Sequence, residues 1–259
     1  MSLSEDGKRV AFLVAEESKN FIVRDGEVVA ESNVAEFDVN WPLAMSADGS
    51  VLAWSGNSKR HGEVAVNGVV RRNFREVRHV QVSRNGKTVA FAARRKDDAW
   101  FIVINGKEGP ECDEIGMPIA ISADGTTIGY YGADDRGEFL QVGDKRLPIP
   151  PGYLRLHLSP DGSPIFEKRD APGSGRRFFE WKGERGPSFS KIEPPSFAPD
   201  GKSITYGATN GETGFVVVGG RTVETPGRIG SPVFSPDGSA VGYGALVGRE
   251  IWWKVIAVR

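Results

Sequence analysis

The chain has 259 residues, of which 39% are hydrophobic and 26% charged, a composition typical of a globular protein. Its 33 basic and 34 acidic residues leave a net charge of −1, which excludes a general electrostatic affinity for nucleic acid. Cys112 is the single cysteine, so a disulfide framework is excluded, and no apolar run approaches the ~20 residues that a membrane helix needs.

The first residues carry no targeting signal that we recognise. Residues 1–6 lack the basic start and the apolar core of a signal peptide. If Met1 is the native start, a cytoplasmic location is expected; the alternative is that the chain is a fragment of a longer protein.

One short turn recurs from end to end. It is an Asp-Gly pair, once Asn-Gly, and the gaps between successive copies are 42, 37, 39, 37, 39 and 37 residues. A fixed period in this range, with strand-like residues between the turns, is typical of a propeller or a solenoid. The seven copies begin at Asp6, Asp48, Asn85, Asp124, Asp161, Asp200 and Asp237.

Each unit has the same predicted order of strands. A short apolar strand leads into the Asp-Gly turn, and a second strand follows with a branched, a small and an aromatic residue in succession. Copies of this triplet are residues 10–12, 52–54, 89–91, 128–130, 204–206 and 241–243, whereas the fifth unit reads Ile165-Phe166-Glu167. A polar loop of variable length, a third strand, a second hairpin turn and a shorter polar strand complete the unit.

Four antiparallel strands repeated seven times predict an all-β fold, a seven-bladed β-propeller that occupies residues 1–259 as a single domain. A β-solenoid needs shorter repeats and fewer tight hairpins, so it is rejected. The seventh unit stops at Arg259 without a second hairpin signal, which predicts a last blade of only three strands.

The units resemble the TolB-like repeat family of the WD-repeat-like superfamily, whose blades carry a Ser-Pro-Asp-Gly-Lys-x-Val-Ala-Tyr consensus. Residues 197–206 and 234–238 carry it best, and the resemblance extends over the whole chain. It implies the propeller fold but not one function, because such propellers serve as protein-interaction modules, as gating domains of prolyl-oligopeptidase-like enzymes and as sensor ectodomains.

Candidate binding residues lie in the loops opposite the Asp-Gly turns. Both tight turns of a blade share one face, so the polar loops and the blade-to-blade crossings share the other, and variable loops on a rigid scaffold are where binding residues concentrate. The alternative is that these are ordinary solvated side chains. The candidates are Trp41, Arg60, His61, Arg94, Arg95, Asp134, Asp135, Arg136, Tyr153 and Arg169.

Catalytic chemistry receives little support from the sequence. The three histidines, His61, His79 and His157, occupy dissimilar positions in separate units, so no metal-binding spacing is found and no metal or cofactor is expected. No Gly-x-Ser-x-Gly motif occurs. The carboxylate pair Asp134-Asp135 is expected to be solvated rather than tuned.

Two further groups stand out. A basic cluster comprises Arg71, Arg72, Arg75, Arg78 and His79; it is either an anion or acidic-partner site or charge that protects an edge strand. Trp252 and Trp253 alternate across the last strand, so one is expected in the core and the other exposed.

These observations favour a non-enzymatic binding or scaffold module that contacts a protein or a small ligand. We expect no membrane association and a monomer or weak dimer. Two alternatives stay open: an enzyme with a carboxylate-based site at the channel mouth, and an accessory or sensor propeller of a larger protein.

Overall fold

The computed structural model describes residues 1–16, 19–32, 36–37, 43–58, 61–95, 98–116 and 118–258. Every regular element among these residues is a strand. None of them forms a helix that is long and apolar enough to cross a membrane.

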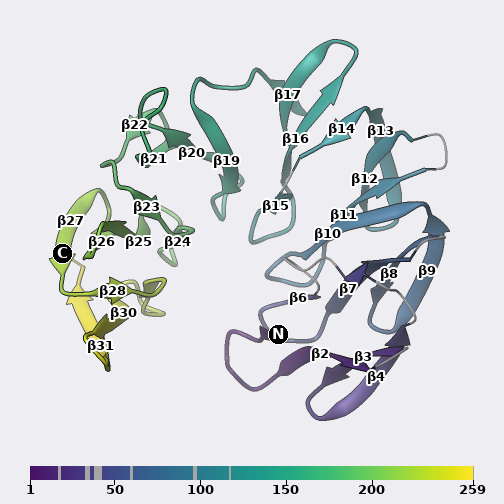
Figure 1. The fold of residues 1–259 in the computed structure, drawn as a ribbon, viewed down its shortest axis with the longest axis horizontal. Coiled ribbons are helices and arrows are strands. Elements are labelled where there is room, and N and C mark those ends of the chain that lie inside the picture. Colours follow the sequence, from purple (N-terminus) through teal and green to yellow (C-terminus); the bar gives the residue numbers. More distant parts are fainter. Residues whose placement is uncertain are drawn as a thin grey trace. The chain divides into compact units, whose positions relative to one another are not determined.

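The chain divides into two compact units, residues 1–149 and 150–259. Unit 1 contains four antiparallel sheets, named A to D in chain order, and most of their strands are labelled in Figure 1. Sheet A comprises β1 (Ser2–Leu3), β2 (Val10–Glu16), β3 (Lys19–Arg24) and β4 (Glu27–Ser32). Sheet B comprises β5 (Glu36–Phe37), β6 (Leu43–Met45), β7 (Leu52–Asn57), β8 (Gly62–Val66) and β9 (Val69–Phe74). Sheet C comprises β10 (Glu76–Val82), β11 (Val89–Arg94), β12 (Trp100–Ile104) and β13 (Lys107–Cys112). Sheet D comprises β14 (Glu114–Ile115), β15 (Ala120–Ile121), β16 (Ile128–Asp134), β17 (Gly137–Val142) and β18 (Lys145–Leu147).

Unit 2 contains three further antiparallel sheets, E to G. Sheet E comprises β19 (Tyr153–Leu158), β20 (Pro164–Arg169), β21 (Arg177–Trp181) and β22 (Glu184–Arg185). Sheet F comprises β23 (Lys191–Ile192), β24 (Ser196–Phe197), β25 (Ile204–Asn210), β26 (Thr213–Val218) and β27 (Arg221–Thr225). Sheet G comprises β28 (Arg228–Ile229), β29 (Val233–Phe234), β30 (Ala240–Val247) and β31 (Glu250–Ala257).

Sheets B, D, F and G contain an interrupted first strand. In sheet D, β14 and β15 both pair with β16, and in sheet G, β28 and β29 both pair with β30. Because β31 pairs with β30 along its whole length, β28 and β29 lie on the other edge of β30 as two segments of one strand. The described part of sheet G therefore has three strand positions and the other six sheets have four. The fold is a seven-bladed β-propeller, as predicted.

Six of the seven Asp-Gly or Asn-Gly turns share one set of hydrogen bonds that begins with a serine hydroxyl, and sheet F has Ala198 in place of that serine. In the second unit, the Ser46 hydroxyl donates to Asp48 at 2.6 Å and accepts from the backbone N–H of Val51 at 3.0 Å, while Gly49 N–H donates to the Ser46 carbonyl at 2.9 Å. Gly49 has a φ of +70°, which favours glycine, whereas Asp48 does not lie in that region. Of the two residues of this turn, only Gly49 therefore needs the left-handed region.

The second hairpin turns of sheets A, B, C, E and F have a different geometry. In Asn67-Gly68 both residues have positive φ, +47° and +81°, as expected for a type I′ turn between twisted strands. The two turns of a sheet lie at the same end because four antiparallel strands bring them there. We call this the turn end of each sheet and the opposite end the loop end.

The core is formed by the aromatic triplets and the third strands. The aromatic residues of five triplets, Trp54, Phe91, Tyr130, Tyr206 and Tyr243, are at least nine-tenths buried. Phe12 of the first triplet is only partly buried, so the expectation that every triplet aromatic belongs to the core does not hold for it. Residues on facing sides of neighbouring sheets pack together, so that each blade covers one side of the next within its unit.

The expectation for the two last tryptophans is wrong. Trp252 is 51% exposed and Trp253 is 69% exposed. Both belong to β31, the outermost described strand of sheet G, and no further described strand covers its free edge. The Trp253 ring packs against Gly242 of its own sheet, which leaves its other side exposed.

Candidate functional site

The loop end of sheet C holds the most extensive polar network described in unit 1. The strand register places Glu76 opposite Arg94 and Trp100 opposite Cys112, at the end of the sheet remote from the Asn85-Gly86 turn. This end combines the start of β10, the end of β11 and the start of β12. Two predicted residues, Arg94 and Arg95, lie here.

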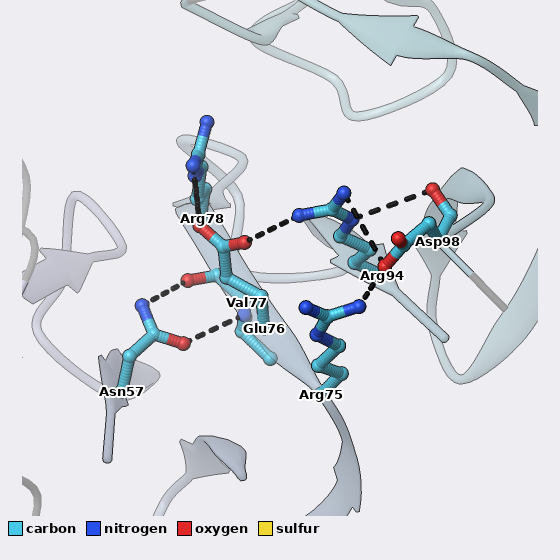
Figure 2. A network of polar contacts seen from close by, with 7 residues as sticks. All are labelled: Asn57, Arg75, Glu76, Val77, Arg78, Arg94 and Asp98. Atoms are coloured by element: carbon cyan, nitrogen blue, oxygen red, sulfur yellow. Dashed lines mark hydrogen bonds and ion pairs between the residues drawn. The ribbon is translucent and has the colours of Figure 1, made fainter. Parts of the chain in front are cut away.

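Arg94 is the centre of this network, which Figure 2 shows with its neighbours as sticks. Its guanidinium lies 3.5 Å from the Glu76 carboxylate and 3.3 Å from that of Asp98. Asp98 also pairs with Arg75, and Glu76 accepts a hydrogen bond of 2.5 Å from Arg78 Nε. Three arginines thus share two carboxylates, and each guanidinium is held in a defined orientation.

Two of these arginines lie over an aromatic ring. The Arg78 guanidinium carbon lies 4.8 Å from the Trp100 ring centroid, and that of Arg94 lies 5.6 Å from it. Trp100 itself is only 7% exposed. The stacking fixes the guanidinium planes while leaving their outer edges accessible, since the Arg78 side chain keeps 44% of its exposure.

Arg95 forms a similar arrangement, with two carboxylates and an aromatic ring, on the opposite face of sheet C. It pairs with Glu108 and Glu111 of β13, and its guanidinium lies 4.7 Å from the Phe101 ring centroid. The sequence identified the two arginines but missed Glu76, Asp98 and Trp100. The sequence did contain a signal for Trp100. It follows the polar 94–98 loop closely in the chain, so it begins the next strand at the same end of the sheet as Arg94.

Sheet B is joined to this site through an amide side chain. Asn57 Nδ2 donates to the Val77 carbonyl and Asn57 Oδ1 accepts from the Val77 N–H, both at 2.9 Å (Figure 2). Such a double contact substitutes for a strand pair and fixes the loop end of β7 against β10. The predicted residue His61 follows in the same loop.

His61 is held by its own loop and lies near a buried acid. Its backbone N–H donates to the Ser58 hydroxyl at 3.1 Å, and its Nε2 lies 4.0 Å from Glu63, whose side chain is 1% exposed. Glu63 also accepts a hydrogen bond from the Ser32 hydroxyl of sheet A. The other two candidates of this region, Trp41 and Arg60, lie outside the described residues.

Asp134 departs from the sequence expectation. It lies at the end of β16 and accepts two hydrogen bonds from Arg146, at 2.5 and 2.7 Å. Arg136 donates two more, from its side chain at 2.9 Å and from its backbone N–H at 3.0 Å. The Arg146 contact holds the pKa of the Asp134 carboxyl well below its ordinary value. Asp134 is therefore tuned by a specific partner rather than simply solvated, while its neighbour Asp135 is 92% exposed as expected.

In unit 2, Tyr153 and Arg169 contribute to a cleft of about 570 Å³ at the loop end of sheet E. The Arg169 N–H donates to the Gly152 carbonyl at 2.7 Å, which folds the residues before β19 over the end of β20. Lys168 lies in the same cleft and pairs with Glu180 at 3.0 Å. The structure thus brings these two predicted residues together.

The predicted basic cluster is divided by the fold. Arg75 and Arg78 enter the network around Arg94, whereas His79 is 1% exposed and lies in the interior of sheet C, at a register shift of β10 with a φ of +53°. Arg71 lies on β9, with its guanidinium beside Gly106 of sheet C. The side chain of Arg72 is outside the description.

Unit 2 contains a buried acid, Glu167, that is surrounded by basic side chains. Glu167 of sheet E is 4% exposed and lies 3.1 Å from Arg177, 3.9 Å from His157 and 4.0 Å from Arg155. Burial raises the pKa of this carboxyl, but the contacts with His157, Arg177 and Arg155 outweigh it and the pKa lies below its ordinary value. No set of three or more potential metal ligands occurs among the described side chains.

The comparisons with known proteins establish the fold. No family model matches the sequence, and no curated protein matches it. Among solved structures, one similar to this chain is that of oligogalacturonate lyase in complex with manganese. The alignment covers 99% of this chain and 88% of the lyase chain, at 12% sequence identity and a TM-score of 0.56. The Dos1 propeller aligns over 92% and 73%, at 10% identity and a TM-score of 0.54.

A third similar structure is the β-propeller domain of the trilobed protease from Pyrococcus furiosus. It aligns over 84% of both chains, at 13% identity and a TM-score of 0.52. Identities this low support a common propeller fold, and because the neighbours include enzymes they leave activity open. Membership of the TolB-like family stays a prediction.

Proposed function

We propose that this chain is a non-enzymatic binding module that contacts an acidic protein partner through the loop end of sheet C. The observation that carries this proposal is the array of oriented guanidinium groups, in which Arg78 and Arg94 stack on Trp100 and share Glu76. Arginines held in place before binding lose little side-chain entropy when they meet a partner.

The number of free N–H donors on these arginines supports a partner that supplies hydrogen-bond acceptors. A guanidinium has five N–H donors, and the bonds within this network leave several of them directed outward. Arg75 and Arg78 keep 48% and 44% of their side-chain exposure, so these donors are accessible. Carboxylates of a protein partner pair with such groups in bidentate geometry.

The nature of the surface favours a protein over a small ligand. The guanidinium groups are spread over several strands of one sheet end, with a further ion-paired group at Asp134 and Arg136 in sheet D. Arginine and aromatic residues dominate the binding energy of protein interfaces, while surrounding charges tune on-rate and specificity.

The test is affinity capture from source lysate, followed by binding measurements with the purified partner. The loop-end variant is Arg75→Glu, which reverses an exposed charge at the edge of the network. The matched control is Lys87→Glu, which reverses an exposed charge next to the Asn85-Gly86 turn. A partner that depends on the loop end is lost with Arg75→Glu and kept with Lys87→Glu, and its affinity falls as salt rises.

Two results would contradict the proposal. Equal binding by both variants would move the interface away from sheet C. Turnover by the purified protein that disappears with Glu167→Gln or Glu63→Gln would favour the enzyme alternative.

A further inference from the structure

A separate pocket lies between sheets E and F at their turn ends, within unit 2. Its volume is about 260 Å³. Aromatic and aliphatic side chains form much of its wall, with the glycines of the nearby hairpins and the charged residues Glu184, Arg185 and Lys202 around them. The apolar lining consists of Phe179, Trp181, Ile204, Tyr206 and Val217.

Two residues of this lining each have a polar atom that is buried without a hydrogen-bond partner in the protein. They are the indole Nε1 of Trp181 and the hydroxyl of Tyr206. Tyr206 is 1% exposed as a whole, so its hydroxyl has no route to bulk water through its own surface. Buried polar groups in folded proteins are almost always hydrogen-bonded, and two exceptions in one pocket call for a common explanation.

The surrounding rings fix the positions of both atoms. The Tyr206 and Phe179 rings meet edge to face with centroids 4.9 Å apart, and the Trp181 and Phe197 rings do so at 6.3 Å. A side chain at Gly186, another lining residue, would place its Cβ 3.0 Å from the Tyr206 hydroxyl oxygen. The hydroxyl therefore lies directly behind Gly186, which itself belongs to the pocket lining.

The charge around the pocket narrows the class of ligand. The Trp181 indole N–H can only donate, and the Tyr206 hydroxyl can donate as well, so both can donate to a ligand oxygen with free lone pairs. The exposed Lys202 makes no ion pair among the described residues, and it adds a positive charge to the lining. Burial raises the pKa of the Tyr206 hydroxyl, which keeps its proton available for donation.

We propose that this pocket binds a small carboxylic acid with an aromatic or branched apolar body. The carboxylate would accept hydrogen bonds from Trp181 Nε1 and the Tyr206 hydroxyl while Lys202 balances its charge. The volume lies just below the usual range of about 300–1,000 Å³ for ligand pockets, which fits a single-ring acid rather than a nucleotide. The site lies at the turn ends of sheets E and F, and the proposal does not depend on the function proposed for sheet C.

The experiment follows the indole N–H signals of the full chain in a ¹H–¹⁵N correlation spectrum, with Trp181→Phe used to assign the Trp181 signal. Three probes of similar size are titrated: phenylacetate, phenylacetamide and phenethylammonium. We expect phenylacetate to shift the Trp181 signal in a saturable way, phenylacetamide to bind more weakly, and phenethylammonium, which offers no acceptor, to have no effect.

Two variants separate the contributions of the lining. Tyr206→Phe keeps the ring and removes the hydroxyl, and it should weaken phenylacetate roughly tenfold, the value of one net hydrogen bond. Lys202→Ala should weaken phenylacetate but leave phenylacetamide unchanged. Because the hydroxyl has no partner in the protein, Tyr206→Phe should melt at or above the temperature of the parent chain, which shows that the variant folds.

Several outcomes would overturn the proposal. One is a Trp181 signal that responds to none of the probes at millimolar concentration and shows contact with an ordered water only. Another is equal binding of phenylacetate and phenethylammonium, or phenylacetate affinity that is unchanged in both Tyr206→Phe and Lys202→Ala. A large loss of stability in Tyr206→Phe would show that the hydroxyl already has a protein partner.

Discussion

The two ends of the sheets follow different rules. At the turn ends a serine, an aspartate or asparagine and a glycine recur with nearly the same hydrogen bonds, except in sheet F, where Ala198 takes the place of the serine. In Ser122-Ala123-Asp124-Gly125, for example, the Ser122 hydroxyl donates to Asp124 at 2.6 Å. At the loop ends each sheet is different. Sheet C has stacked arginines, sheet D has Asp134 with Arg146, and sheet E has a cleft beside Arg169.

This difference separates folding from recognition within the chain. In unit 1 the repeated turns are also tied to one another, since Glu5 N–H donates to the Ala47 carbonyl and Ala47 N–H to the Arg84 carbonyl, both at 2.9 Å. A uniform, hydrogen-bonded end gives each blade the same register. Variation at the other end costs the fold little and supplies distinct surfaces.

The largest effect is expected in the core on which both ends depend. Phe91 is 5% exposed, so Phe91→Ala should reduce the free energy of unfolding by about 3–5 kcal/mol. Arg95→Ala, at the loop end of the same strand, removes ion pairs of a side chain that is 43% exposed and should cost less than about 1 kcal/mol. Chemical denaturation measures both, and equal losses would mean that the strand register is wrong.

The next test compares the two ends directly. Ser122 is fully buried, and its hydroxyl accepts from the Thr127 N–H at 2.9 Å. Ser122→Ala should cost about 1–3 kcal/mol because it leaves buried polar groups without partners. Arg75→Ala at the loop end should cost less than about 1 kcal/mol. If Arg75→Ala destabilised the protein more than Ser122→Ala, the conclusion that the turn ends contribute more to folding than the loop ends would be wrong.

The turn network also predicts a pH dependence. The hydrogen bonds from the Ser46 hydroxyl and from Ser50 lower the pKa of Asp48 to about 2. A carboxyl with a lowered folded pKa stabilises the protein above its unfolded pKa of about 3.9, and this contribution is lost as the pH falls toward 2. NMR titration of the Asp48 carboxyl measures the value directly. In Asp48→Asn this part of the pH dependence should disappear from the denaturation curves.

The smallest effect concerns the loop end of sheet D. Arg146 lowers the pKa of Asp134, so Arg146→Gln should raise that pKa toward its ordinary value and remove a stabilisation that is present at neutral pH. The loss should fade as the pH falls below about 3.9, because Asp134 in the unfolded chain is then protonated. Arg136→Gln, at a side chain that is 71% exposed, serves as the control. An Asp134 titration that responds equally to both variants would contradict this order of partners.

Much of the fold could be predicted from the sequence because its determinants are local. The turn residues lie within five positions of one another, and the branched-small-aromatic triplets alternate within a single strand. The same local reasoning failed for Trp252 and Trp253, which have the pattern of a half-buried strand but lie on the outermost described strand of sheet G. Burial depends on what covers a strand, and the strand itself does not contain that information.

The candidate site was predicted only as a set of loop residues. Sequence alone placed Arg94 and Arg95 at the loop end, because strand alternation and hairpin spacing decide which end of a sheet a loop occupies. Only the tertiary structure decided that Arg94 meets Glu76 from 18 positions away and that Arg78 shares its stack on Trp100. It likewise brought the unpartnered Trp181 and Tyr206 atoms of two sheets to one pocket. Backbone hydrogen bonding and side-chain alternation are fixed over a few residues, whereas contacts between side chains on different strands and sheets depend on how those strands and sheets pack.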